Sequence, residues 1–259
     1  YEFLLRPPIN TVFIGKNHRH LLKVESTNAY MRQTLDSSSI SIPEGLLVTT
    51  DEQFSGKGQG AKSWLSEPKQ NLTLSILLRP VFLPPRYVFY LNKAVAMAVH
   101  DTLATEMHGI AIKWPNDLYH HNNKLGGILI ENVIDSTSIR QSIIGIGINV
   151  NQTAFDTLIP NPTSISLVTG RETDLSALLE KLCGQLEKYY LQLRASQFTA
   201  IDALYHHYLF GHQAEHEFLL NNEKITATVN GVNPEGKLIL STPDSKLTLA
   251  VGEVTWILP

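Results

Sequence analysis

Residues 113–131 gather polar groups at a chain reversal between two apolar runs. The segment combines two lysines, an Asn-Asp pair and a Gly-Gly step, which a soluble core does not need. Because Pro115 has no amide donor and biases the residue before it toward an extended conformation, Lys113 is expected at a strand end, with Asn116 and Asp117 in the turn beyond it. A lysine beside a glycine pair suits an anion, so the segment predicts an anion-handling site. The alternative is a surface hairpin with solvated charges.

The length and composition predict a soluble globular protein with one large domain and a small appendage. The 259 residues can bury a large core, and 43% of them are hydrophobic and 17% charged. Every apolar run is interrupted before the roughly 18 residues that suggest a membrane-spanning helix. With 24 acidic and 21 basic residues the net charge is −3, which gives no general attraction to nucleic acid. We therefore expect neither a nucleic-acid nor a membrane partner.

The single cysteine, Cys183, lies in the amphipathic pattern of a helix and cannot form a disulfide within the chain. It is expected in the core. A reducing compartment suits such a chain, and no charged-then-apolar signal segment follows Tyr1. We therefore expect a cytoplasmic protein.

The periodicity of apolar residues predicts both strands and helices. Residues 72–78 alternate as in a half-buried strand, and from Val88 to Met107 apolar residues recur at three- and four-residue steps, as on one face of a helix. Glycines interrupt the strand expected at 143–150, which usually marks the close approach of a ligand or a packed helix. The other expected elements are a short helix capped at 26–28 and running to Leu35, strands at 46–50, 110–114 and 127–133, and helices at 174–194 and 197–209.

Beyond Gly211 the pattern changes to short alternating runs separated by turn residues, which is typical of an all-β module. About five short strands in about fifty residues predict a small barrel. We therefore expect a boundary near residue 210, between a domain at 1–210 and a small domain at 211–259.

A second polar segment, residues 53–64, is rich in glycine and lysine. Glycines let a backbone approach a ligand and present amide donors, while Lys57 and Lys62 supply charge for a phosphate. The segment matches neither a Walker loop nor a dinucleotide-binding motif, so a mobile surface loop is an equal alternative. For Asn149, at the end of the glycine-interrupted strand, a bond to its own turn and a contact with a ligand are equal alternatives.

Metal and serine-nucleophile chemistry are not indicated. The ten histidines include two adjacent pairs, His120–His121 and His206–His207, whose rings diverge on a strand or a helix. No set of His, Cys and carboxylate residues has zinc-ligand spacing, and no Gly-x-Ser-x-Gly motif occurs.

Taken together, these residues resemble those of biotin protein ligases, in the group that lacks an N-terminal DNA-binding domain. The resemblance is most specific in residues 113–131, which follow the family pattern without a gap. It also covers Glu25 to Asn28, Gln53 to Trp64, Asn71 to Pro80, Gly145 to Val150, and Gly252 to Val254.

The resemblance implies an α+β fold, in which a class II synthetase-like mixed sheet is backed by helices on one face and carries the site on the other. A small SH3-like β-barrel follows. It also implies a two-step reaction in which biotin and MgATP give biotinyl-5′-AMP and pyrophosphate. A lysine of the biotin carboxyl carrier protein of acetyl-CoA carboxylase then takes the biotinyl group. Magnesium would come with ATP rather than in a dedicated protein site. Family members include monomers and dimers, so a homodimer stays open.

By motif, the resemblance assigns each candidate residue a role. The catalytic residues are Lys124 and Lys113, near phosphate, and Asp117, which would accept a proton from the carrier lysine or orient it. The biotin-binding residues are Ser26, Thr27, Asn28, Gln53, Gly56, Lys57, Lys124 and Gly127. The ATP- and adenylate-binding residues are Lys57, Gly58, Gln59, Trp64, Asn116, Lys124 and Asn149, with Trp64 beside the adenine.

The glycine-rich loop departs from the family pattern Gly-Arg-Gly-Arg-x-Gly-Arg. Lys57, Gln59 and Lys62 occupy the arginine positions, and Ala61 replaces a glycine. Lysine lacks the planar fork that grips phosphate, and glutamine lacks the charge, so we expect weaker retention of the adenylate.

Two alternatives stay open at this point, and a third is not expected. Lipoate ligases share the architecture and the acyl-adenylate strategy, although the Ser-Thr-Asn and Lys-Trp-Pro-Asn-Asp motifs favour biotin. A non-catalytic sensor of biotin or adenylate is compatible with the altered loop. A ligase that also represses transcription needs a helix-turn-helix module, for which the residues before Glu25 leave no room.

Overall fold

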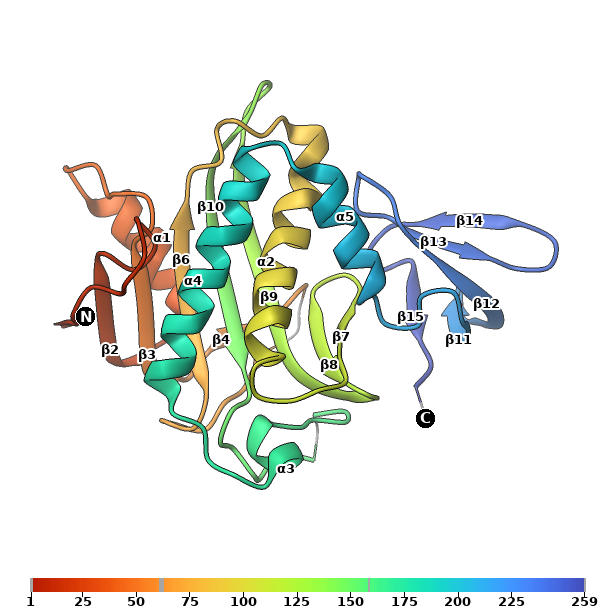
Figure 1. Cartoon of the computed structure of the whole chain (residues 1–259), viewed down its shortest axis with the longest axis horizontal. Coiled ribbons are helices and arrows are strands. Elements are labelled where there is room, and N and C mark those ends of the chain that lie inside the picture. Colours follow the sequence, from red (N-terminus) through yellow and green to blue (C-terminus); the bar gives the residue numbers. More distant parts are fainter. Residues whose placement is uncertain (1, 61–62, 158, 259) are drawn as a thin grey trace.

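The computed structural model describes residues 2–60, 63–157 and 159–258, and its centre is an eight-stranded mixed sheet (Figure 1). Strands β2 and β3 pair in parallel, and the other neighbours in the sheet are antiparallel. In spatial order the strands are β1 (Leu4–Leu5), β2 (His18–Val24), β3 (Leu47–Gln53), β6 (Leu72–Leu78), β10 (Ile139–Ile148), β9 (Asn123–Ile134), β8 (Asp117–His120) and β7 (Ile110–Lys113).

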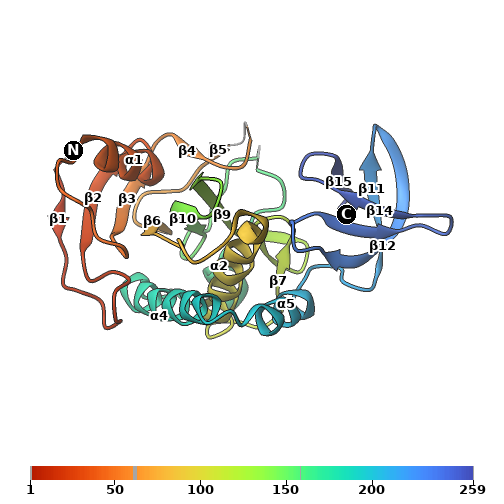
Figure 2. The same cartoon turned by 90° about the horizontal axis from the view of Figure 1, so that it is seen from above.

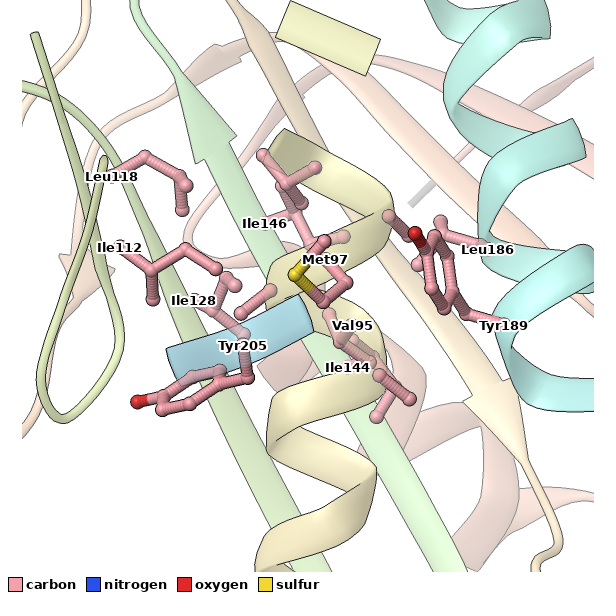
Figure 3. Packing of buried hydrophobic residues seen from close by; sticks show 14 of the residues in the cluster. Val95, Met97, Ile112, Leu118, Ile128, Ile144, Ile146, Leu186, Tyr189 and Tyr205 are labelled. Carbon is pink, nitrogen blue, oxygen red and sulfur yellow. The ribbon is translucent and has the colours of Figure 1, made fainter. Parts of the chain in front are cut away.

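Three helices cover one face of this sheet (Figure 2). They are α2 (Val88–Leu103), α4 (Leu175–Arg194) and α5 (Phe198–His207). Their apolar stripes meet the even-numbered residues of β10, because successive strand residues point to opposite faces. Figure 3 shows Ile144 and Ile146 of β10 beside Val95 and Met97 of α2, with Tyr189 of α4 next to them. The predicted mixed sheet backed by helices is confirmed.

The short helix α1 (Thr27–Ser37) lies on the opposite face of the sheet (Figure 2). Its Tyr30 and Met31 pack with Leu77 of β6 and Ile143 of β10 in a second, smaller cluster. These strand residues have the opposite parity to those that meet α2. The N-terminus of α1 therefore lies on the sheet face that α2, α4 and α5 do not cover.

The observed elements differ from the predicted ones in a few places. Helix α2 ends at Leu103 rather than near Met107, although Met107 is buried and its backbone N–H still reaches the Leu103 carbonyl at 3.1 Å. Trp114, expected in a strand, lies in the turn after β7, and its bond to Pro115 is cis. The elements that the sequence did not predict are β1, β2, β8, β4 (Gly56–Lys57), β5 (Ser63–Trp64), a 3₁₀ turn at Pro85–Tyr87, and α3 (Ile165–Thr169).

Asp117, expected in a turn, is instead the first residue of strand β8. The chain reverses over only three residues, 114–116, and Asp117 then pairs with Lys113 across a tight hairpin. On its other side, β8 pairs with β9, where Gly127 faces Asp117.

The C-terminal region forms a separate five-stranded sheet. Its order is β14 (Lys246–Leu249), β13 (Leu238–Ser241), β12 (Glu223–Val232), β11 (Glu215–Leu220) and β15 (Val254–Trp256). The five short strands expected here are present. In the described part of this region β14 and β15 stand at opposite edges, so the sheet is open rather than a closed barrel.

The second sheet is bonded to the large domain through buried polar groups. The indole N–H of Trp114 donates to the Gly236 carbonyl at 2.8 Å, and the fully buried Lys93 of α2 bonds Asp202 and the Val232 carbonyl.

Cys183 is also fully buried, and burial raises its thiol pKa to about 12. None of the helices in residues 2–60, 63–157 and 159–258 has both the length and the apolar character needed to cross a bilayer.

Candidate active site

A cleft of about 1160 Å³ opens on the sheet face that carries α1. The large sheet, the glycine-rich hairpin and the C-terminal sheet all contribute to its walls. The candidate residues that line it are Ser26, Thr27, Asn28, Gln53, Lys57, Gly58, Gln59, Trp64, Lys113, Asn116, Asp117, Lys124, Gly127 and Asn149. Segments far apart in the sequence are thus brought to one site.

Gly56 is the candidate that does not line the cleft within the described residues. It is buried in the β4–β5 pair opposite Trp64, where a Cβ atom would lie 2.3 Å from Nε2 of Gln53. Its role in this structure is therefore to make room for Gln53. Ala61 and Lys62, also named for this loop, lie outside the described residues.

At one end of the cleft, the first residues of α1 are held by side chains from the sheet. Ser26 caps the helix, since its Oγ accepts from the Ala29 backbone N–H, and the Thr27 backbone N–H donates to Oε1 of Gln53 at 2.9 Å. Such capping is typical of serine and satisfies helix N–H groups that have no partner within the helix. The predicted cap at 26–28 is confirmed.

Asn28 lies across the sheet beneath this helix end. Its amide nitrogen donates to Oε2 of Glu131 at 3.0 Å, and its carboxamide oxygen accepts from the fully buried Ser75 hydroxyl at 2.5 Å. Ser75, Gly145 and Leu129 are neighbours on adjacent strands. Ser75 and Glu131 were not predicted as site residues, although both fall in segments that resemble the family pattern.

Glycines form the floor of the cleft on β10. A Cβ atom on Gly145 would lie 2.5 Å from Asn28 Oδ1, and one on Gly147 would lie 2.4 Å from the Trp64 indole. The close approach expected at these glycines is therefore made by two side chains of the protein itself. The Nε1 atom of Trp64 is buried and has no hydrogen-bond partner among the described residues.

A lysine and a carboxylate meet in the middle of the cleft. The Lys124 ammonium lies 2.7 Å from Oδ1 of Asp117, and both side chains are partly exposed. The same ammonium is 5.9 Å from the centre of the Trp64 ring. At Gly127, opposite Asp117 in the sheet, the absence of a side chain keeps the space beside this pair open.

Lys113 lies between aromatic rings of the two sheets. Its ammonium is 5.0 Å from the Tyr119 ring centre and 5.6 Å from that of Trp256. Burial and the nearby Asp117 raise the pKa of Tyr119, which stays neutral at physiological pH. Trp256 was not predicted, although it follows the matching Gly252 to Val254 motif, which could have found it.

Asn116 and Asn149 of the cleft are both bonded to backbone carbonyls. The Asn116 amide donates to the Ile128 carbonyl, and the Asn149 amide donates to the Thr163 carbonyl at 3.0 Å. Each of these asparagines therefore has a structural role and also lines the cleft. Within the described residues, no three His, Cys, Asp or Glu side chains gather where they could hold a metal ion.

The mixed sheet, the helices behind it and the lysine-bearing cleft in front define a class II synthetase-like ligase domain. A model of the biotin/lipoate A/B protein ligase family matches residues 23–149. The bifunctional ligase/repressor BirA of Bacillus subtilis is 31% identical over 246 residues, which cover 93% of this chain and 74% of the relative. The chain belongs to the biotin/lipoate A/B protein ligase family.

Other relatives match nearly from end to end. The biotin--[acetyl-CoA-carboxylase] ligase of Mycobacterium tuberculosis is 24% identical over 265 residues, covering 96% of each chain. Among solved structures, the biotin protein ligase of Aquifex aeolicus in complex with biotin and ATP superposes with a TM-score of 0.77 at 26% identity, covering 93% of this chain and 98% of that one.

Proposed function

We propose that the protein is an ATP-dependent biotin protein ligase. A biotin carboxylate oxygen attacks the α-phosphorus of ATP, and pyrophosphate leaves. A carrier lysine nitrogen then attacks the carbonyl of biotinyl-5′-AMP, and AMP leaves. The observation that carries the proposal is the cleft in which Lys124 and Asp117 lie between a polar pocket at the α1 N-terminus and the glycine-rich hairpin. The names of the relatives and the biotin and ATP bound in the Aquifex protein support it.

For adenylation, the lysines of the cleft bring two anions together. A carboxylate and a triphosphate repel each other, so positive charge must stabilise both the complex and the transition state. Lys124 and Lys113 supply that charge from the sheet, and Lys57 supplies it from the hairpin. Gly58, Gln59, Asn116 and Asn149 line the nucleotide part, with Trp64 beside the adenine. Magnesium would arrive bound to the phosphates of ATP.

For biotin, the polar pocket at the α1 N-terminus holds the ureido head group. Ser26, Thr27, Asn28 and Gln53 offer hydrogen-bonding groups there, and Gly56 allows Gln53 its position. Gly127 leaves room for the part of biotin next to the Lys124 ammonium. A buried polar ring system needs every one of its groups matched, since an unpaired buried group costs about 1–3 kcal/mol.

For transfer, Asp117 acts on the incoming amine. A protonated lysine cannot attack a mixed anhydride, so a carboxylate that accepts the proton or orients the amine makes the second step faster. Asp117 lies at the cleft with one oxygen on Lys124.

The acceptor of this reaction is a biotin carboxyl carrier protein, as the names of relatives that act on acetyl-CoA carboxylase suggest. We further propose that residues 1–210 form the catalytic domain and that 211–259 form a separate small domain that closes one end of the cleft with Trp256. The absence of nucleic-acid and membrane partners and a cytoplasmic location remain part of this proposal, which leaves the choice between a monomer and a homodimer open.

The test is pyrophosphate release from ATP with biotin or lipoate, followed by incubation with a purified carrier domain. Biotin-dependent release and biotinylation of the carrier are expected. Lipoylation without biotinylation would make the protein a lipoate ligase. Biotin binding without any pyrophosphate release would make it a sensor.

A further inference from the structure

A chain of hydrogen bonds runs from the protein surface to the cleft through five side chains. Arg32 and Glu131 form an ion pair at the surface end, and Glu131 accepts from the Asn28 amide at 3.0 Å. Asn28 Oδ1 lies 2.5 Å from the Ser75 hydroxyl, which lies 2.8 Å from the hydroxyl of Thr27. Thr27 lines the cleft.

The orientation of the Asn28 amide follows from its neighbours. A carboxylate paired with arginine and a backbone carbonyl can only accept hydrogen bonds. Glu131 Oε2 and the Leu129 carbonyl, at 3.0 and 3.4 Å, therefore both require the amide nitrogen on their side. The oxygen of Asn28 must then face Ser75.

The position of each hydroxyl proton follows in turn. Asn28 Oδ1 cannot donate, so the single proton of Ser75 must lie between the two oxygens. Ser75 has no second proton for Thr27, and the 2.8 Å contact is a hydrogen bond only if Thr27 donates to Ser75. The other acceptor of the Thr27 proton is Oε1 of Gln53, which lies farther away at 3.4 Å and also belongs to the sheet. The Thr27 hydroxyl therefore donates its proton to a residue of the sheet. Toward the cleft, Thr27 Oγ1 presents only lone pairs and can only accept a hydrogen bond.

We infer that Glu131 sets the polarity of the head-group pocket: acting through Asn28 and Ser75, it makes Thr27 Oγ1 a hydrogen-bond acceptor that selects a ligand N–H. The inference rests on the proposed function, since a cyclic urea presents such an N–H. Glu131 touches no ligand and is a positioning residue. In a cyclic carbamate a ring oxygen replaces that N–H. This oxygen would face Thr27 Oγ1, so that two hydrogen-bond acceptors would lie against each other.

The inference is tested by calorimetric titration with biotin and with the two carbamate analogues that each replace one ureido N–H by oxygen. The intact protein should bind one of the two carbamates at least about tenfold more weakly than biotin. In Glu131→Gln the new amide can donate to Asn28, so Asn28 can turn round and Thr27 is freed to donate to the ring oxygen. The preference for biotin over that carbamate should fall at least about threefold.

Ser75→Ala frees the Thr27 proton directly and should lower the same preference. The matched control is Ser142→Ala, since Ser142 is another fully buried strand serine bonded to an asparagine oxygen, Asn132, outside the cleft lining. This control should keep the preference of the intact protein. If Ser75→Ala does not fold, the partly exposed Glu131 position decides alone.

An unchanged preference in Glu131→Gln overturns the inference, and so does an intact protein that binds biotin and both carbamates equally. Either result leaves the proposed function standing, because biotin is bound. If the intact protein binds biotin neither alone nor with ATP, the proposed function itself fails.

Discussion

The Lys124 ammonium lies 2.7 Å from the Asp117 carboxylate because a β-bulge turns Lys124 to the cleft face of the sheet. Asp117 pairs with Gly127, but Tyr119 pairs with Lys124, so Leu125 is an extra residue on β9. Without the bulge, the period of two would direct Lys124 and Gly127 to opposite faces. The bulge thus places the cation, the carboxylate and the open glycine position on one side.

Replacing Lys124 with alanine should lower biotin-dependent pyrophosphate release by at least about a hundredfold while the protein still folds. The reason is that the cation between the two reacting anions is lost and its partly exposed site tolerates a small side chain. The matched control is Lys181→Ala, because the Lys181 ammonium is likewise 2.7 Å from a carboxylate, that of Glu106, and neither residue lines the cleft. Release near the intact rate in Lys124→Ala would contradict the assigned role.

Replacing Asp117 with asparagine should slow the second step more than it weakens biotin binding. The amide keeps the size of the side chain but cannot accept a proton from the carrier lysine, so transfer should slow by at least about tenfold. Single-turnover transfer from preformed biotinyl-5′-AMP to a carrier domain measures this step alone. A transfer rate equal to that of the intact protein would remove Asp117 from its proposed role.

The sequence predicted the elements with strong periodicity and the segments that meet at the cleft. The apolar stripes of α2 and α4, the strand at 72–78 and the five C-terminal strands are present. The helices were predicted correctly because burial of one face leaves a regular trace in the residue order. The strand at 72–78 was expected to be half-buried, but all seven of its residues are buried, because α1 packs on the face opposite α2.

Other features could not be predicted because they depend on pairing across the sheet. The residues around Leu125 show no sequence pattern that indicates a bulge. The bulge is visible only in the register of β8 with β9. Glu131 reads as an ordinary polar strand residue until Asn28, about a hundred positions away, is packed against it. The position of Trp256 beside Lys113 depends on how the second sheet docks on the first.

Lowering the pH from 7 to 5 should destabilise the protein through buried histidines at the sheet edge. Burial lowers the pKa of His18 from 6.5 to about 4, and burial also lowers the pKa of His20, which shares Thr49 as a bonding partner. A folded pKa below the unfolded one means that stability is full above pH 6.5 and is lost as the pH falls toward 4. About 1 kcal/mol should be lost by pH 5.

Urea unfolding of the intact protein and of His18→Gln at pH 7 and pH 5 isolates this effect. Glutamine does not titrate, so the variant should be less stable at pH 7 but should lose less stability on acidification. Carboxylates that titrate in the same range contribute equally to both proteins and cancel in the comparison. Equal losses in the two proteins would exclude His18 as the source.

Replacing Gly147 with alanine should displace Trp64 from the floor of the cleft. The new Cβ would lie 2.4 to 2.7 Å from three atoms of the indole, which real contacts do not allow. The ring must move, at a cost of about 1–3 kcal/mol in stability, and adenylate affinity should fall with it. Tryptophan fluorescence and titration with a non-hydrolysable biotinyl-adenylate analogue measure both changes.

The same substitution at Gly184, in helix α4, should have the opposite effect on stability. Gly184 lies inside a helix with no atom within 4 Å of its would-be Cβ, so Gly184→Ala should stabilise the protein by about 0.5–1 kcal/mol and leave adenylate binding unchanged. The contrast separates steric crowding at the floor from the general effect of adding a methyl group. If Gly147→Ala binds the analogue as tightly as the intact protein does, then the position of Trp64 against β10 is not required for the nucleotide.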